Sequence, residues 1–406
     1  MRRPRLNWPN ISRRGFMKGS VAATVAATAV AILPGCTNSE SEWQVPEPLV
    51  VDEDQSISIT EEYEEVELAL KERNSWTVPL GSVLHESDSS WVAVTQAGMS
   101  AAPMVKGSAF SLAGGVMAEV ISDVSGDSHT RVIYDVRCSS EVYAWVELDI
   151  LNHSWDLFAA KFVEGHIEGT PTKLWASDAE YDPPGFVVTG NTVLWQITPA
   201  LSGSHTTEPS FCYLWRLGQD SAKAVVESPG RFPVAPSVSG DLAILVPRVR
   251  ANEGVYYGVS AFSISSDLET IVDQMVLPQT IKPFYATRIG DRFAVSIEAN
   301  YSSGGMFGSM GTYIGTSSGP FVRLAREPSA NVAGNLDTFI IKSRTSYFVV
   351  DVRKATYSIL AAANRCVDYG DYPVRVGEVA EFVTYATVKD ENSGYPMNVV
   401  VREFGF

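Results

Sequence analysis

Three histidines are the residues of this chain whose type best suits metal binding or proton transfer. His129, His153 and His205 fall in three successive segments that separate predicted strands. Imidazole nitrogens bind zinc, and a neutral imidazole can act as a general base near neutral pH. No recurrent ligand spacing accompanies the three residues. We therefore predict solvated loop histidines and no cofactor, with a three-histidine metal site as the weaker alternative.

Carboxylates are the second group that could do chemistry. Acids occur in the segments that enter the predicted strand units, at Asp127, Asp178, Glu180, Asp182, Asp368 and Asp371. Paired carboxylates can hydrolyse glycosidic bonds, but the sequence does not determine the distance between them. In an acidic chain most such residues are surface groups. A hydrolase or lyase acting on a glycan or on a small ester or lactone is therefore the alternative function.

Soft and aromatic side chains in long loops favour binding rather than catalysis. We predict a candidate binding face that contains Met99, Trp155, Tyr301, Phe307 and Tyr395. Adaptable methionines and amphipathic aromatic rings suit a protein or carbohydrate partner. Long loops on a rigid scaffold commonly carry binding function. The preferred function is therefore a non-catalytic binding or assembly module.

The elements that must position these residues recur along the chain. Residues 238–246, Val-Ser-Gly-Asp-Leu-Ala-Ile-Leu-Val, are an extended segment, a tight turn and an apolar strand. Gly-Asp and Gly-Asn favour tight hairpins because glycine adopts a positive φ without steric cost. By subtraction of their positions, successive turns lie 43 to 53 residues apart, at Ser87, Ser140, Gly190, Gly240, Gly290, Gly334 and Gly377.

Units of this length with several short strands are typical of β-propellers, in which one sheet is one blade. We predict an all-β fold over residues 61–406, a seven-bladed β-propeller with four-stranded antiparallel blades. The last unit offers three strands, so an N-terminal strand within residues 61–73 is expected to close the ring and remove an exposed edge. The units loosely resemble the TolB-type propellers of envelope proteins.

The N-terminus carries the pattern of an export signal. Residues 12–18, Ser-Arg-Arg-Gly-Phe-Met-Lys, precede an uncharged segment at residues 19–35. This pattern resembles the twin-arginine translocation signal, which makes Arg13, Arg14 and Phe16 the export-signal residues. Residues 33–36, Leu-Pro-Gly-Cys, resemble a lipobox, although Pro34 stands where a small residue is usual. The resemblance implies lipidation of Cys36; cleavage without lipid and an uncleaved anchor are the alternatives.

This signal defines the expected organisation and location of the chain. Residues 1–36 are the signal with its lipobox, and residues 37–60 are an acidic tether with two prolines. The resemblance implies a domain outside the cytoplasm, attached to the membrane through lipid on Cys36. The expected partner is then an envelope protein or a glycan.

The charge balance excludes one class of partner. The residues after Cys36 contain 25 Lys and Arg against 47 Asp and Glu, and 25 − 47 gives a net charge of −22. Phosphate backbones need a basic surface, so we exclude nucleic acid. Cys138, Cys212 and Cys366 are an odd number without a Cys-x-x-Cys pair. We predict that they are buried thiols in a disulfide-free core.

Overall fold

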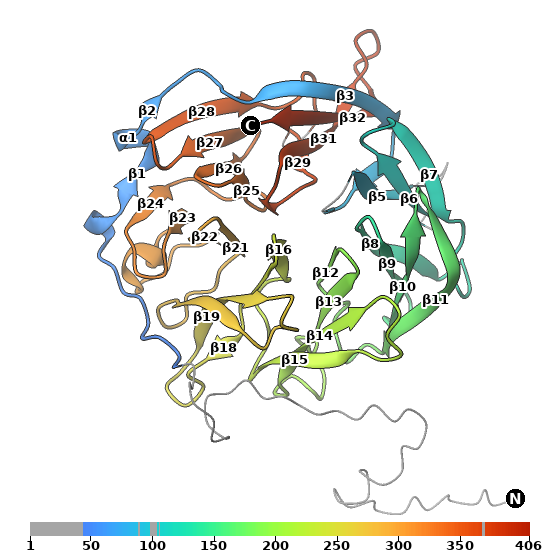
Figure 1. The fold of residues 1–406 in the computed structure, drawn as a ribbon, viewed down its shortest axis with the longest axis horizontal. Helices are drawn as coiled ribbons and strands as arrows, with labels where there is room; N and C mark the ends of the chain where they lie inside the picture. The colour runs from blue at the N-terminus through green and yellow to red at the C-terminus, as the bar shows by residue number, and fades with distance from the viewer. Residues whose placement is uncertain (1–43, 88–89, 98–103, 105, 368–369) are drawn as a thin grey trace, which may run out of the picture.

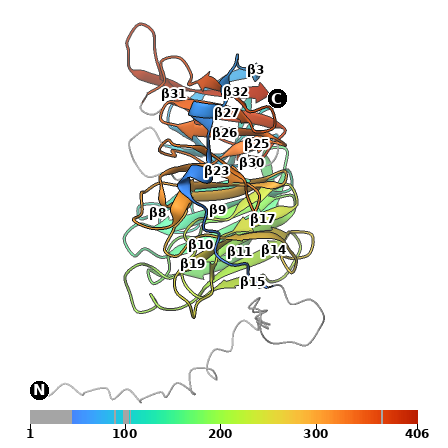
Figure 2. The same ribbon diagram turned by 90° about the vertical axis from the view of Figure 1, so that its left-hand side faces the viewer.

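The computed structural model describes residues 44–87, 90–97, 104, 106–367 and 370–406. The chain is an all-β propeller of mostly antiparallel sheets arranged around a central axis (Figure 1). Helices in the described part of the chain are short: η2 (Glu53–Gln55), α1 (Ile59–Glu62) and η3 (Gly305–Gly308). Seen from the side, the strands of the sheets fill the depth of the ring (Figure 2).

The described strands form seven separate hydrogen-bonded sheets, which we number in chain order. Sheet 1 contains β4 (Ser82–Leu84), β5 (Trp91–Gln96), β6 (Lys106–Ser111) and β7 (Val116–Ile121). Sheet 2 contains β8 (Arg131–Cys138), β9 (Val142–Asp149), β10 (Trp155–Val163) and β11 (His166–Ser177). Sheet 3 contains β12 (Phe186–Thr189), β13 (Thr192–Ile197), β14 (Ser210–Arg216) and β15 (Lys223–Ser228). Sheet 4 contains β16 (Ser237–Ser239), β17 (Leu242–Leu245), β18 (Arg248–Val249), β19 (Tyr256–Ser263) and β20 (Ile271–Val276).

The remaining three sheets also recruit strands from the N-terminal segment. Sheet 5 contains β21 (Tyr285–Ile289), β22 (Arg292–Ile297), β23 (Gly311–Gly315), β24 (Phe321–Leu324) and β1 (Ile57–Ser58). Sheet 6 contains β25 (Ala333–Asn335), β26 (Thr338–Ser343), β27 (Ser346–Asp351), β28 (Thr356–Ala361), β2 (Glu64–Glu65) and β30 (Gly377–Glu378). Sheet 7 contains β29 (Tyr372–Pro373), β31 (Glu381–Lys389), β32 (Pro396–Gly405) and β3 (Lys71–Pro79).

The hydrophobic core lies between neighbouring sheets. Each neighbouring pair, including sheets 7 and 1, encloses one cluster of buried apolar residues. Large rings such as Trp195 and Phe293 are fully buried there, because a bulky ring fills the space between two sheets. Burying such a side chain contributes about 1.5–3 kcal/mol. The core therefore holds the sheets in a closed ring.

The N-terminal segment follows the outer rim of the ring. Pro48 bridges to Val276 of sheet 4, β1 pairs in parallel with β24, and β2 pairs in parallel with β28. Ile59 between β1 and β2 has no exposed surface and packs in the core of sheets 5 and 6. The described part of the expected tether, from Gln44 to residue 60, is therefore packed against the propeller.

Two details of the predicted architecture need correction. The ring is closed by an N-terminal strand, but that strand is β3, which pairs antiparallel with β32 and begins later than predicted. Sheets 4, 5 and 6 contain more than four strands, and sheets 5 and 6 include parallel pairs. Strands β1 and β2 add to sheets 5 and 6 because a chain that runs along an outer edge can satisfy its backbone groups there. Strand β18 instead pairs with β19 within sheet 4, and β30 pairs with the inner strand β25.

Candidate axial binding site

The segment of residues 374–380, which connects β29 to β31 of sheet 7, crosses the centre of the ring. Its strand β30 pairs in parallel with β25 of sheet 6. The amide nitrogen of Glu378 donates to Ser239 Oγ of sheet 4 at 3.0 Å. On the other side, Asn335 Nδ2 donates to the carbonyl oxygen of Val379 at 2.8 Å. The crossing segment is therefore held by sheets that do not adjoin each other, and it forms one wall of an axial pocket.

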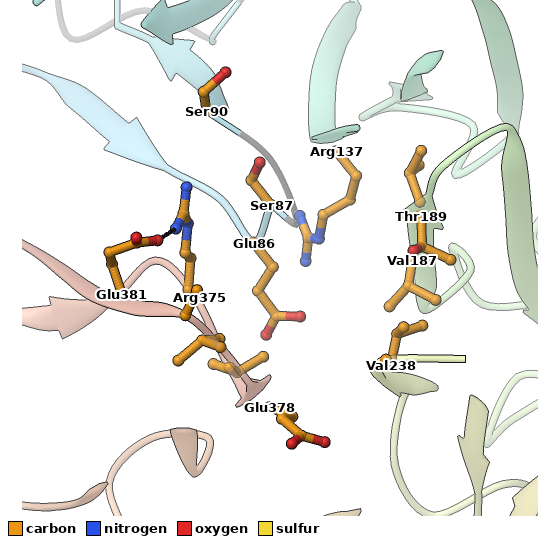
Figure 3. A pocket seen from close by; sticks show the side chains of 15 residues that line it. Glu86, Ser87, Ser90, Arg137, Val187, Thr189, Val238, Arg375, Glu378 and Glu381 are labelled. Atoms are coloured by element: carbon orange, nitrogen blue, oxygen red, sulfur yellow. Dashed lines mark hydrogen bonds and ion pairs between the residues drawn. The ribbon is translucent and has the colours of Figure 1, made fainter. Parts of the chain in front are cut away.

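The axial pocket has a volume of about 530 Å³. Figure 3 shows its side chains converging from several sheets around the axis. Its polar lining consists of Glu86, Ser87, Ser90, Arg137, Thr189, Arg375, Glu378 and Glu381. Its apolar lining consists of Val187, Val188, Val238, Val376, Val379 and Ala380. Thr189 ends β12 and Gly240 follows β16, so the pocket lies at the face of the short turns, opposite the long loops.

Glu86 is held between two distant sheets. It follows β4 of sheet 1, and its Oε1 accepts a hydrogen bond from Asn331 Nδ2, just before β25 of sheet 6, at 2.5 Å. Burial raises the pKa of Glu86, although the Arg137 guanidinium and the Asn331 hydrogen bond act in the opposite direction. Glu86 is therefore a carboxyl group whose charged form is poorly solvated.

Arg137, at the end of β8, points into the pocket (Figure 3). Its Nη1 donates to Asp135 and to the carbonyl oxygen of Val136, and its guanidinium carbon lies 5.4 Å from the centroid of the Phe186 ring. His85 Nδ1 lies 2.9 Å from Asp135 Oδ1. Burial raises the pKa of Asp135, but Arg137 and His85 outweigh it and the net shift is downward. Asp135 is therefore the anionic partner of Arg137.

A second arginine is paired in the same way. Arg375 is 8% exposed, and its Nη1 lies 3.0 Å from Glu381 Oε2. Arg73 Nη1 lies 3.8 Å from the other oxygen of Glu381. Glu378, by contrast, is exposed, and among the described residues no cation forms an ion pair with it. The pocket thus combines two paired arginines with further carboxylates and an aliphatic wall.

The predicted binding face is not assembled as expected. Trp155 is 1% exposed in the core between sheets 2 and 3, and its Nε1 donates to the carbonyl oxygen of Tyr181. Phe307 in η3 is fully buried between sheets 4 and 5. This corrects the prediction for both residues, because large rings gain more free energy in the core than in water. Tyr301 is half-buried, Tyr395 is 76% exposed, and Met99 lies outside the described residues.

The three candidate histidines have separate local partners. His129 Nδ1 lies 2.9 Å from Asp127, and His153 occupies a turn with a φ of 56°. His205 Nδ1 lies 2.6 Å from Glu208, and this hydrogen bond raises the pKa of His205. In the part of the chain that the structure describes, no three His, Cys, Asp or Glu side chains are grouped as metal ligands.

Sequence reasoning missed the charged residues of the axial pocket. Glu86, Arg137 and Arg375 lie one to three residues before the turn positions Ser87, Ser140 and Gly377. Arg288 has the same offset from Gly290, but it pairs with Asp273 at 3.3 Å and does not line the pocket. The offset alone therefore does not identify the pocket residues.

Sheet 5 also contains a serine motif. Residues 315–319, Gly-Thr-Ser-Ser-Gly, have the Gly-x-Ser-x-Gly spacing of a nucleophile elbow. In the structure this stretch connects β23 to β24 as a turn between two antiparallel strands. A nucleophile elbow instead joins a strand to a helix. The motif therefore does not indicate a serine nucleophile here.

The predicted export and lipidation residues, Arg13, Arg14, Phe16 and Cys36, lie outside the described residues. Within the described ranges, no helix has the length and apolar character needed to cross a membrane.

Comparison with known proteins gives weak structural similarities. No protein family and no curated protein matches the sequence. The structure resembles puromycin hydrolase (11% identity, TM-score 0.48, 85% of this chain and 55% of that chain). It also resembles the β-propeller domain of the Trilobed protease from Pyrococcus furiosus (9%, 0.46, 80% and 94%) and acylaminoacyl peptidase from Pyrococcus horikoshii (11%, 0.40, 64% and 43%). The chain thus spans about half the length of the two full-length enzymes, and TM-scores at this level carry no argument about activity.

Proposed function

We propose that this chain is an exported, lipid-anchored β-propeller of seven blades, each of the seven sheets being one blade, that acts as a non-catalytic binding module. The axial pocket is its ligand site. The observation that carries this proposal is a cavity of about 530 Å³ in which charged side chains from different sheets converge beside an aliphatic wall. Concave pockets with a few converging polar groups are characteristic of small-molecule sites.

The cellular setting follows from the N-terminal sequence. The twin-arginine pattern at Arg13 and Arg14 and the lipobox at Cys36 support export and attachment through lipid. The expected partners are then components of the envelope, either a protein or a glycan. Replacing both arginines by lysine should leave the precursor in the cytoplasm. Normal export of that double variant would overturn the export assignment.

A second candidate is a hydrolase or lyase acting on a glycan or a small ester or lactone. The observation in its favour is Glu86, because a carboxyl group with a raised pKa in a concave pocket suits a general acid. Glu378, in the same lining, would be the second carboxylate. The hydrogen-bond partner of Glu86 is the neutral amide of Asn331 and not a second carboxylate, so the binding module is the preferred function.

One experiment separates the two candidates. The purified full-length protein is screened for ligands by thermal shift and for product formation, beside Glu86→Gln and the control Glu298→Gln. Glu298 is exposed after β22, on the face of the long loops. A ligand that stabilises the parent and Glu298→Gln, binds less to Glu86→Gln and is not converted supports the binding module. Turnover that Glu86→Gln abolishes supports the enzyme, and binding unaffected by any pocket substitution refutes the axial site.

A further inference from the structure

We infer that the ligand of the axial pocket presents an aliphatic ammonium group, an inference that rests on the proposed function. The argument starts from the charges of the lining. Arg137 already pairs with Asp135, and Arg375 already pairs with Glu381 at 3.0 Å. Both arginines of the pocket are therefore already ion-paired, although Arg375 shares Glu381 with Arg73.

Two further carboxylates of the lining form no ion pair of this kind among the described residues, although the charge of Arg137 acts to lower the pKa of Glu86. Figure 3 shows Glu86 and Glu378 at the open centre of the site. Glu86 accepts a hydrogen bond from the neutral amide of Asn331, and no Lys or Arg of the described residues forms an ion pair with either glutamate. The net charge of −16 adds a field of the same sign. A cation entering the pocket therefore gains attraction, whereas an anion meets repulsion.

The rest of the lining narrows the kind of cation. None of the described lining residues has an aromatic side chain, so they do not form the ring cage that recognises quaternary ammonium groups. A bare metal ion requires several grouped oxygen ligands, and the described residues form no such group. Val187, Val238, Val376 and Val379 instead offer a surface for a short hydrocarbon chain. A primary ammonium donates three hydrogen bonds, and the carboxylate and hydroxyl oxygens of the lining are acceptors for such donors.

An aliphatic ammonium group can come from two kinds of ligand. A free diamine carries an ammonium on an aliphatic chain, and so does the lysine side chain of a partner protein. The probes are therefore 1,4-diaminobutane and Nα-acetyl-lysine methylamide, compared with uncharged 1,4-butanediol and anionic succinate of similar length. Tighter binding of the diamine identifies a free amine as the ligand type, and tighter binding of the lysine derivative identifies a protein segment.

Calorimetric titration of the full-length protein tests the inference. Glu86→Gln and Glu378→Gln should each weaken binding of the better amine about tenfold or more, because a hydrogen bond to a charged group is lost. Glu298→Gln should bind like the parent. Thr189→Trp, which fills the pocket from the end of β12, should abolish binding. Thermal unfolding of each variant verifies that it is folded.

The outcomes also separate this inference from the proposed function. If butanediol or succinate binds and Thr189→Trp blocks it, the axial site stands and the ammonium ligand is refuted. If neither amine binds, the ammonium ligand is likewise refuted. If an amine binds and Thr189→Trp leaves its affinity unchanged, the axial site itself is refuted.

Discussion

Gly377, on β30 of sheet 6, approaches Val238 of sheet 4 so closely that a β-carbon at residue 377 would lie 2.4 Å from the carbonyl oxygen of Val238. Gly377 also has a φ of 72°, which side-chain-bearing residues rarely adopt. Glycine satisfies both requirements, because it has no β-carbon. This contact across the axis sets the position of the crossing segment, and therefore of one wall of the pocket.

The first prediction concerns this contact. Gly377→Ala should destabilise the fold by more than the backbone cost of about 1–2 kcal/mol, because the crossing segment must also move. Gly240→Ala is the matched control, since Gly240 has a φ of 59° and a β-carbon added to it would meet nothing within 4 Å. Urea unfolding measures both free energies. Equal losses for the two variants would show that the contact with Val238 is unimportant.

The second prediction concerns the N-terminal segment. Ile59→Ala should lower the free energy of unfolding by about 2–5 kcal/mol, because Ile59 has no exposed surface between sheets 5 and 6. Val50→Ala in the same segment should change it by less than about 0.5 kcal/mol, since Val50 is 67% exposed. Chemical denaturation compares the two. If Ile59→Ala hardly changed the free energy of unfolding, the N-terminal segment would be a loosely attached tether and not a packed part of the propeller.

The third prediction concerns the aromatic residues of the long loops. Phe307→Ala should cost about 3–5 kcal/mol of stability, because the ring is fully buried beside Tyr313 and Phe321. Tyr395→Ala should change stability by less than about 0.5 kcal/mol, because its side chain is 76% exposed. Thermal unfolding distinguishes the two expectations. Loss of stability in Tyr395→Ala would contradict this assignment.

The fourth prediction concerns pH. The pKa of Glu86 is raised in the folded protein, by burial above all, so the folded state binds this proton more tightly than the unfolded state. The ionised group therefore costs stability above its folded pKa, and this cost disappears as the pH falls below the unfolded pKa. Glu86→Gln should raise the melting temperature at neutral pH, and the difference from the parent should vanish toward pH 4.

Other charged groups face Glu86 and shape this profile. Arg137, Asp135 and His85 lie on the side of sheets 1 and 2, and Tyr285 faces it from sheet 5. The pKa of Asp135 is lowered, so its contribution has the opposite sign and is lost as the pH falls. Asp135 is present in both proteins, so its contribution to stability cancels when the melting temperatures of Glu86→Gln and the parent are compared at each pH. A difference in melting temperature that does not depend on pH would refute the assignment to Glu86.

The fifth prediction concerns orientation at the membrane. Gln44 is the eighth residue after a lipidated Cys36, a reach of about 29 Å at most. The chain then meets sheet 4, where Arg250 Nη1 donates to the carbonyl oxygen of Pro46. The rim of sheet 4 should therefore face the membrane, and the ring should stand edge-on with the axial pocket open to the side.

Fluorescence quenching by labelled lipid headgroups measures this orientation. A probe at Val272→Cys on β20 of sheet 4 should be quenched more strongly than one at Val116→Cys on β7 of sheet 1, across the ring (Figure 1). Both positions are exposed, and a Cys366→Ser background removes the partly exposed native thiol. Equal quenching of the two probes would contradict the edge-on orientation.

Local patterns predicted the strands and several turns. Gly190, Gly240 and Gly290 form hairpin turns with positive φ, as the Gly-Asn and Gly-Asp pairs indicate. Gly334, however, lies inside β25, and Leu336 with a φ of 50° forms that turn. The turn therefore lies two residues later than predicted, but the repeat is still recognisable, because its spacing depends on whole strand units rather than on one turn residue.

Local sequence patterns were enough to predict an all-β propeller of repeated strand units, because alternation and turn chemistry act between residues close in the chain. The packing of the whole chain was needed to show that Trp155 and Phe307 are core residues, that the N-terminal segment follows the rim, and that Glu86 and Arg137 line the same axial pocket. These outcomes depend on how distant segments pack and compete for burial. No local pattern specifies which side of a ring a charged strand end will face until the whole ring has closed.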